Sequence, residues 1–304
     1  MTRTDQDWMT IAGSRCSAHD VAETALTLVS AELPEVVQYI RPGNDLKLFG
    51  VNSGFFHFPI ACGLESGSIS LEQCRDLATT LALGHAYFSC MDRLLDDRFV
   101  DHALVLAAPE FLRLYIERLG RTFDSVAVQK MHPIYYRQYS VAQVWEWKSN
   151  RSLAPITGDD ITMLSWKSAP VSLPTHLALH SMNERSRDAV LDAFMSYCAG
   201  LQLMDDVADM AEDYDNGISS IPVRLTLTRG LGVGAWPLSG ELSGAELADA
   251  AYRSGSVRTS LILARSFFET AIVGARSVGF RTLLGLAEAR ESLCTVRIAE
   301  PTGA

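Results

Sequence analysis

The 304-residue sequence has no uncharged apolar run of 18 or more residues, so it offers no candidate for a membrane-spanning helix. Its first residues, MTRTDQDWMT, lack the basic-then-apolar pattern of a signal peptide. Basic residues are few: 26 lysines and arginines stand against 36 acids, for a formal charge of −10. Without a basic stripe the chain cannot displace the counterions of a phosphate backbone. We therefore expect a soluble cytoplasmic protein with neither an integral membrane segment nor a nucleic-acid partner.

Paired cysteine motifs are also absent. The six cysteines are scattered without CxxC spacing and mostly lie in apolar surroundings, which is typical of buried reduced thiols. Low-complexity tracts, internal repeats and long linkers are missing as well, and a 48% apolar content can form a substantial core. These features predict a single domain over residues 1–304, with residues 1–16 and 299–304 as flexible ends.

Helical periodicity is what the sequence has in abundance. Apolar residues recur at three- and four-residue spacing, whereas alternating strand patterns are nearly absent. Helix starts are predicted at Ser70, at Thr157 or Gly158, and at Asn183. The predicted helices cover residues 18–40, 69–98, 103–120, 125–149, 158–183, 185–214, 243–276 and 278–298. The expected fold is all-α, a single-domain helical bundle around a central cavity.

Two groups of aspartates interrupt this apolar helical sequence, at residues 92–97 (DRLLDD) and 205–213 (DDVADMAED). Helix positions four residues apart share a face, so each group can present a short ladder of carboxylates. Facing ladders would repel each other unless cations lay between them. Mg²⁺ takes oxygen ligands, uses only one or two carboxylates and commonly bridges to substrate phosphates. The predicted metal ligands are Asp92, Asp96, Asp205, Asp209 and Asp213, and the first four of these are also the predicted catalytic residues.

Three segments carry a family resemblance. Residues 85–97 read HAYFSCMDRLLDD, residues 200–225 read GLQLMDDVADMAEDYDNGISSIPVRL, and Lys167-Ser168-Ala169 lies between them. In this order they resemble the two Asp-rich motifs and the Lys-Thr-Ala or Lys-Ser-Ala signature of the trans-isoprenyl diphosphate synthases, in the class I isoprenoid synthase superfamily. The resemblance implies the isoprenoid synthase type I fold, a prenyl diphosphate substrate and a homodimer. It also implies Mg²⁺ as the cofactor, with three ions per site and Mn²⁺ as an alternative.

The chemistry of such enzymes assigns roles to further residues. Mg²⁺ would accept the negative charge of the departing diphosphate. Lys167, with Arg224 or Arg137, is expected to donate charge-assisted hydrogen bonds to the diphosphate oxygens. The carbocation left behind would be steadied by aromatic faces in the cavity. The candidates for this lining are Phe56, Tyr87, Phe88 and Trp166.

The chain departs from the chain-elongating synthases in four places. Residues 42–47 (PGNDLK) stand where a basic Gly-Lys-Arg segment is expected. Arg93 replaces the second aspartate of the first motif, Arg98 stands alone where an arginine pair is expected, and Ile218 replaces a loop lysine. A second anionic substrate would therefore have few cationic partners. For this reason we expect a class I terpene synthase that ionises a linear prenyl diphosphate, geranylgeranyl or farnesyl, and cyclises or quenches the cation.

Two alternatives remain open. One is a prenyltransferase of the trans-isoprenyl diphosphate synthase type, acting in chain elongation or on a non-isoprenoid acceptor. The other, motivated by Arg93, is a catalytically inactive partner subunit of a heteromeric synthase. Product release from a prenyl diphosphate without any co-substrate would favour the terpene synthase over both.

Overall fold

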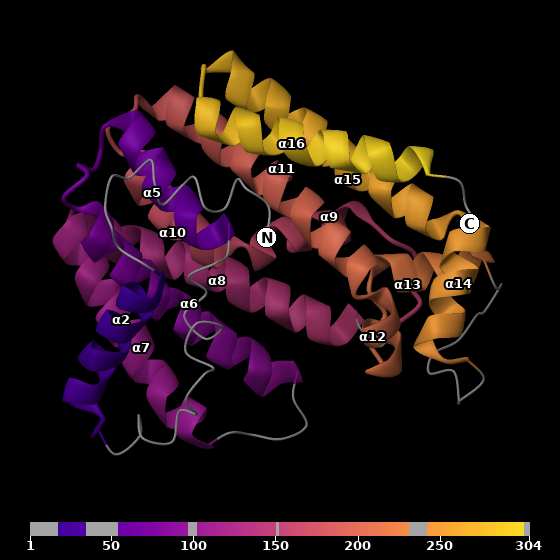
Figure 1. The fold of residues 1–304 in the computed structure, drawn as a ribbon, viewed down its shortest axis with the longest axis horizontal. Helices are drawn as coiled ribbons and strands as arrows, with labels where there is room; N and C mark the ends of the chain where they lie inside the picture. Colours follow the sequence, from indigo (N-terminus) through magenta and orange to yellow (C-terminus); the bar gives the residue numbers. More distant parts are fainter. Residues whose placement is uncertain (1–17, 35–53, 97–101, 150–151, 231–241, 301–304) are drawn as a thin grey trace. The chain divides into compact units, whose positions relative to one another are not determined.

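The computed structural model describes residues 18–34, 54–96, 102–149, 152–230 and 242–300. These residues form thirteen α-helices and one π-helix and contain no strand, which confirms the predicted all-α class (Figure 1). The chain divides into two compact units, residues 1–136 with 170–187 and residues 137–169 with 188–304. The single domain over residues 1–304 and its central cavity stay predictions.

Unit 1 is built on the long helices α6 and α7. At Gly84 of α6, a Cβ atom would lie 2.7 Å from the ring of Tyr115 on α7, so the glycine makes room for this fully buried ring. Helix α2 packs against both α6 and α7, and α5 packs against α6. The helices of unit 1 are α2 (Ala18–Glu32), α5 (Gly54–Ser66), α6 (Cys74–Asp96), α7 (His102–Thr122) and, except for its first residue, α10 (Ala169–Ala178).

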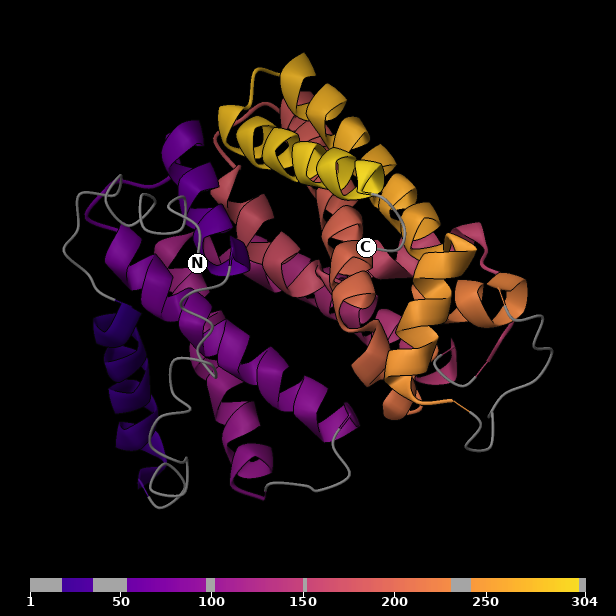
Figure 2. The same cartoon turned by 45° about the vertical axis from the view of Figure 1, so that its right-hand side comes forward.

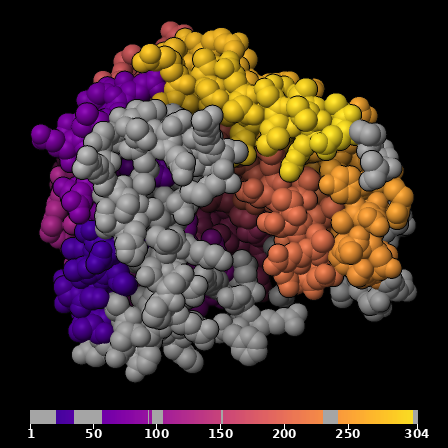
Figure 3. All heavy atoms as spheres, in the orientation of Figure 1, coloured from indigo at the N-terminus to yellow at the C-terminus, as the bar shows by residue number. Residues whose placement is uncertain are grey.

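Helix α8 (Ser125–Ser149) has the predicted bounds and contributes residues to both units. Unit 2 also holds α9 (Gly158–Lys167), most of α11 (Glu184–Ala208), α12 (Met210–Asp215), α13 (Ile221–Leu225), the π-helix η1 (Thr226–Gly230), α14 (Gly244–Ser254), α15 (Ser256–Ser277) and α16 (Arg281–Ala299). Helices α15 and α16 lie side by side in both ribbon views (Figures 1 and 2), and α16 forms a continuous surface of unit 2 in the space-filling view (Figure 3). Unit 2 is therefore a helical bundle, and it contains the second group of aspartates.

Several predicted helices are divided in the structure. The predicted segment 158–183 separates into α9 and α10 at Ser168, because Pro170 has no N–H to continue the helical ladder. The predicted segment 243–276 separates into α14 and α15 at Gly255, whose φ of 77° is left-handed. Helix α5 was not predicted, because its sequence is apolar on every side and shows no amphipathic period.

The described residues bear on two expectations from the sequence, which concern the cysteines and membrane-spanning helices. Five cysteines there are buried thiols outside any disulfide, as predicted, and Cys16 lies outside the described residues. Among the described helices, none combines the length and the apolar character that crossing a membrane requires.

Candidate functional site

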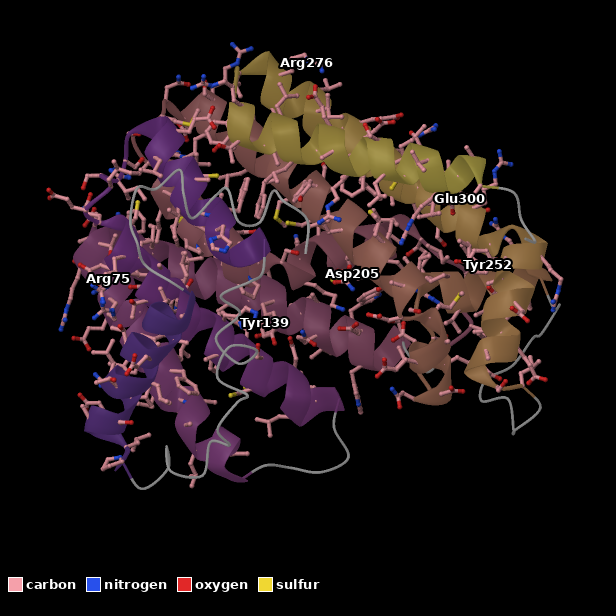
Figure 4. The ribbon with its side chains drawn as sticks, in the orientation of Figure 1. Arg75, Tyr139, Asp205, Tyr252, Arg276 and Glu300 are labelled. Atoms are coloured by element: carbon pink, nitrogen blue, oxygen red, sulfur yellow. The ribbon has the colours of Figure 1, made fainter. Side chains whose placement is uncertain are left out.

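The second group of aspartates lies where α11 meets α12 in unit 2. The two helices are separate because Asp209 has a ψ of 3°, whereas a regular helix has about −42°. The helical hydrogen bonds nevertheless continue through the kink: the Asp209 N–H donates to the Asp205 carbonyl at 2.9 Å, and the Asp213 N–H donates to the Asp209 carbonyl at 2.8 Å. Figure 4 labels Asp205 on α11. The three aspartates thus follow one another at four-residue spacing along a kinked helix.

The far end of this segment is fixed by a glycine turn. Gly217 has a φ of 77°, and the N–H of Ile218 donates to the Asp213 carbonyl at 2.7 Å, which closes α12 in a Schellman arrangement. The Asp215 carboxylate accepts a 2.7 Å hydrogen bond from the N–H of Gly244, the first residue of α14. Asp215 therefore serves helix packing, and the segment 205–215 is held at both ends.

Asp206 experiences strong and opposing electrostatic effects. Burial raises its pKa to about 7, although the charge of Lys167 and a 2.9 Å hydrogen bond from Gln202 oppose that rise. The negative charges of Asp213 and Glu146 push the pKa further upward. The Asp206 carboxylate therefore lies among several like charges with one lysine to balance them.

The neighbouring carboxylates show the same excess of negative charge. Burial, followed by the charge of Asp209, raises the pKa of Asp205. Burial raises the pKa of Asp213 to about 6, and Asp209 again adds to the rise while Ser220 and Lys167 oppose it. Since each pKa rise reports a disfavoured carboxylate charge, a cation placed here would be favourable.

The aspartate carboxylates of this segment are suitable ligands for Mg²⁺. Carboxylate oxygens are the ligands that the ion prefers, and the repulsion between Asp205, Asp209 and Asp213 would be relieved by it. Within the described ranges, no three metal-binding side chains converge on one point. An ion held here would therefore take one or two aspartates and fill its remaining positions with water or phosphate oxygens, which is how Mg²⁺ usually binds.

Lys167 is the last residue of α9, and its side chain pairs with Glu146 of α8. The Lys167 Nζ lies 2.5 Å from the Glu146 Oε1, and both side chains are largely buried, at 19% and 25% exposure. The charge of Lys167 also acts on Asp205, Asp206 and Asp213. The predicted diphosphate-binding lysine is thus next to the second group of aspartates.

The other end of α9 is fixed by Asp160. Thr157, one of the two predicted starts, is the N-cap. It forms a capping box in which the Asp160 carboxylate accepts a 2.6 Å bond from the Thr157 N–H. The same carboxylate accepts bonds from Trp145 Nε1 at 3.1 Å and from Arg224 Nη2 at 3.3 Å. Burial raises the pKa of Asp160, but the Thr157 bonds and the Arg224 charge outweigh burial and hold the pKa below its usual range.

Arg224 and Arg137, the two arginines predicted to bind diphosphate, have surroundings that differ from those of Lys167. Arg224 is 3% exposed and pairs with Asp160, so this arrangement gives it a structural partner. Arg137 is exposed on α8, nine residues before Glu146, which places it on the opposite side of that helix and about 14 Å away along the axis. The contact of either arginine with diphosphate stays a prediction.

The first group of aspartates belongs to unit 1. Asp92 is exposed near the end of α6, while the side chain of Asp96 lies outside the described residues. Tyr87, in the same helix, is buried, shares a 2.9 Å hydrogen bond with Tyr136 and meets the ring of Phe88 edge-on at 4.9 Å. The metal-binding role of Asp92 and Asp96 stays a prediction.

Trp166 and Phe56 are the other two aromatic residues predicted to line the cavity. Trp166 is half-buried on α9, next to Lys167. Phe56 belongs to α5, and its side chain lies outside the described residues. The assignment of these rings to a cavity stays a prediction.

Two charged residues near the aspartates were not predicted. One is Glu146, described above. The other is Arg290 of α16, whose charge opposes the pKa rises of Tyr197 and Asp205. Neither residue has a local sequence signal, because each reaches the aspartates only through the packing of distant helices.

No family model and no curated protein matches the chain by sequence. Solved structures do match. A decaprenyl diphosphate synthase from Rhodobacter capsulatus has a TM-score of 0.71 and 13% identity over 97% of this chain and 99% of that one. A geranylgeranyl pyrophosphate synthase from Corynebacterium glutamicum has a TM-score of 0.71 and 15% identity over 97% of this chain and 93% of that one.

A third match, a polyprenyl synthase from Caulobacter crescentus, was solved in complex with calcium and isoprenyl diphosphate. It has a TM-score of 0.60 and 15% identity over 89% of this chain and 97% of that one. The similarity extends over nearly the whole length of each chain, at identities that establish the fold. The chain therefore has the fold of the trans-isoprenyl diphosphate synthases, the class I isoprenoid synthase fold that its three motifs predict.

Proposed function

We propose that the protein is a Mg²⁺-dependent enzyme that ionises an allylic prenyl diphosphate, and that its first candidate reaction is transfer of the prenyl group to an acceptor. The carrying observation is the group of carboxylates at Asp205, Asp206, Asp209 and Asp213, with Lys167 beside it, on an isoprenoid synthase fold. The similar solved structures are prenyl diphosphate synthases, which favours prenyl transfer over the terpene synthase expected from sequence. A homodimer with three metal ions per site, Mg²⁺ or alternatively Mn²⁺, is part of this proposal.

The chain's own residues would divide the work as follows. Asp205, Asp209 and Asp213 hold the cations through their carboxylate oxygens, and Lys167 donates to the diphosphate. Asp92 and Asp96 stay proposed as further metal ligands. When bound, Mg²⁺ supplies Lewis-acid stabilisation of the leaving diphosphate. No strong general acid is needed for such a departure.

A terpene synthase is the second candidate, favoured by residue identities in the sequence. Arg93 stands where the first motif has its second aspartate, and Ile218 stands where a loop lysine is expected. Fewer cations are then left for a second diphosphate substrate. A cyclase needs only one diphosphate and would tolerate this loss.

One assay separates the candidates. The purified protein is incubated with Mg²⁺ and C10, C15 or C20 prenyl diphosphate, with and without isopentenyl diphosphate, and the products are analysed by gas chromatography before and after phosphatase treatment. A longer prenyl alcohol that forms only with isopentenyl diphosphate supports prenyl transfer. Hydrocarbon or alcohol that forms from a single substrate and is detected before phosphatase treatment supports the cyclase, because phosphatase itself converts unreacted substrate into its alcohol. If no substrate releases diphosphate, the enzyme proposal fails.

Paired variants show whether the carboxylates carry this activity. Asp209→Ala should abolish turnover because it removes a metal ligand from the kink between α11 and α12. Asp192→Ala is the matched control, since Asp192 is an exposed aspartate of α11, the helix that leads into the kink. Equal activity in both variants would disqualify Asp209 as a ligand.

A further inference from the structure

Helix α9 is held at both ends by two adjacent residues of α8. Trp145 donates to Asp160 in the first turn of α9, and Glu146 pairs with Lys167 at its last residue. Asp160 and Lys167 are seven residues apart, which places them on one face of the helix and separates them by about 10 Å along its axis. This double attachment fixes both the rotation and the position of α9 against α8.

The attachment at Glu146 bears directly on the lysine side chain. A free lysine has four flexible carbons and about 2 kcal/mol of rotamer entropy to lose when it is fixed. The 2.5 Å contact with Glu146 fixes that side chain before any ligand arrives. An ammonium group has three donors, and the Glu146 contact uses one of them, so pairing with Glu146 does not by itself prevent Lys167 from donating to a second anion.

The Glu146–Lys167 pair lies where an additional negative charge is unfavourable. Glu146 adds its negative charge to a region where Asp206 and Asp213 already repel each other, and the effect of Glu146 reaches both of them. A neutral residue at position 146 would relieve that repulsion. The pair is also largely buried, unlike the exposed ion pairs whose contribution is small. A carboxylate in this place is best explained by what it does to Lys167.

We propose that Glu146 is the positioning residue for Lys167, holding its ammonium group beside the second aspartate group so that a metal-bound diphosphate meets a donor already in place. This inference rests on the proposed function, because it takes diphosphate as the ligand. Glu146 itself touches no substrate in this proposal and acts through the lysine.

The test is the binding of inorganic pyrophosphate at saturating Mg²⁺, measured by isothermal titration calorimetry. Glu146→Gln keeps the shape of the side chain but removes its charge, and it should weaken pyrophosphate binding about tenfold, the equivalent of 1.4 kcal/mol. Lys167→Ala should weaken binding more, because it removes the donor itself. In the double variant the Glu146→Gln change should have no additional effect, since there is no lysine left to position.

Further variants keep the test decisive. Glu269→Gln is the matched control, because Glu269 forms an exposed ion pair with Arg265 elsewhere in unit 2, and its pyrophosphate affinity should equal that of the unmodified protein. Glu146→Asp retains the charge but withdraws it by one methylene group, so its affinity should also fall. It serves in the same cycle if the glutamine variant does not fold by circular dichroism.

The outcomes separate the two proposals. If the unmodified protein does not bind pyrophosphate with Mg²⁺, the proposed function fails and this inference fails with it. If the unmodified protein binds but Glu146→Gln binds equally well or more tightly, then Glu146 does not position the lysine, and only this inference is overturned. Losses that multiply in the double variant would likewise overturn it, because they would show an effect independent of Lys167.

Discussion

Asp160 makes more hydrogen bonds than its short side chain would suggest. Its two carboxylate oxygens accept bonds from Thr157, Trp145 and Arg224, which belong to the start of α9, to α8 and to α13. The carboxylate is 6% exposed and its arginine partner 3% exposed. A single residue therefore joins three elements of unit 2, and the buried guanidinium depends on it for a counter-charge.

Replacement of Asp160 by Asn should destabilise the protein by about 3–5 kcal/mol, because it leaves the charge of Arg224 buried without a carboxylate partner. Urea denaturation at pH 7, followed by circular dichroism, measures the change in the free energy of unfolding. Asp159→Asn is the matched control: Asp159 is the preceding residue and is exposed, so its loss should cost less than about 1 kcal/mol. Similar losses in both variants would show that the Asp160 network contributes little.

The same network predicts a dependence on pH. The folded pKa of Asp160 is lowered, so its contribution to stability is complete above the unfolded aspartate pKa of about 3.9 and is lost as the pH falls through the folded pKa. The stability gap between the unmodified protein and Asp160→Asn should therefore be constant near neutral pH and close as the pH falls below 4. Denaturation series at several pH values measure the gap, and a gap that widened in acid would contradict this assignment.

Helix starts marked by a capping residue in the sequence were predicted, whereas features without such a local signal were missed. The start of α9 was predicted at Thr157 or Gly158 because two aspartates follow directly, and the structure has a capping box there. Asn183 likewise caps α11, where the Ser186 N–H donates to its side chain. Helix α5 was missed because a segment that is apolar on every side has no polar face to reveal its period. The kink at Asp209 has no Pro or Gly to announce it.

Helices α12 and α14 approach each other so closely that only glycine fits at position 244. A Cβ atom there would lie 2.1 Å from the Ala211 carbonyl oxygen, a backbone atom that cannot rotate away. Gly244→Ala should therefore destabilise the protein by about 1–3 kcal/mol. Thermal unfolding is the measurement.

Gly285→Ala gives the opposite expectation and serves as the control. Gly285 is exposed within α16 with open space around its Cβ position, so alanine should stabilise the protein by about 0.5–1 kcal/mol through helix propensity. Opposite signs for the two substitutions support the close packing of α12 on α14. Stabilisation by both would rule that packing out.

Over the whole chain, the sequence predicted the fold class and the four-residue spacing of three aspartates along a helical segment, but not the charges around them. Asp205, Asp209 and Asp213 were found because their spacing is a local property of one segment. Glu146 lies some sixty residues earlier in the sequence and Arg290 about eighty residues later, so only tertiary packing brings their charges to the aspartates. For Arg224 the sequence shows the charge, but it does not show that this charge is buried in an ion pair with Asp160.

Ligand binding at the second aspartate group should stabilise the whole protein. A metal–diphosphate complex that binds only the folded state adds about 2.7 kcal/mol at a concentration one hundred times its Kd. The melting temperature should therefore rise by several degrees with Mg²⁺ and pyrophosphate together, and chelation with EDTA should reverse the rise. The rise should be small with Mg²⁺ alone, because one or two aspartates leave most of the ion's coordination positions to water.

The aspartate variants assign that stabilisation to the site. Asp209→Ala should lose most of the rise in melting temperature, since it removes the carboxylate whose charge acts on both Asp205 and Asp213. Asp192→Ala removes the same charge from an exposed position of α11 and should keep the full rise. A full rise in both variants would place the metal and diphosphate elsewhere, because the ladder at the α11–α12 kink would then bind neither.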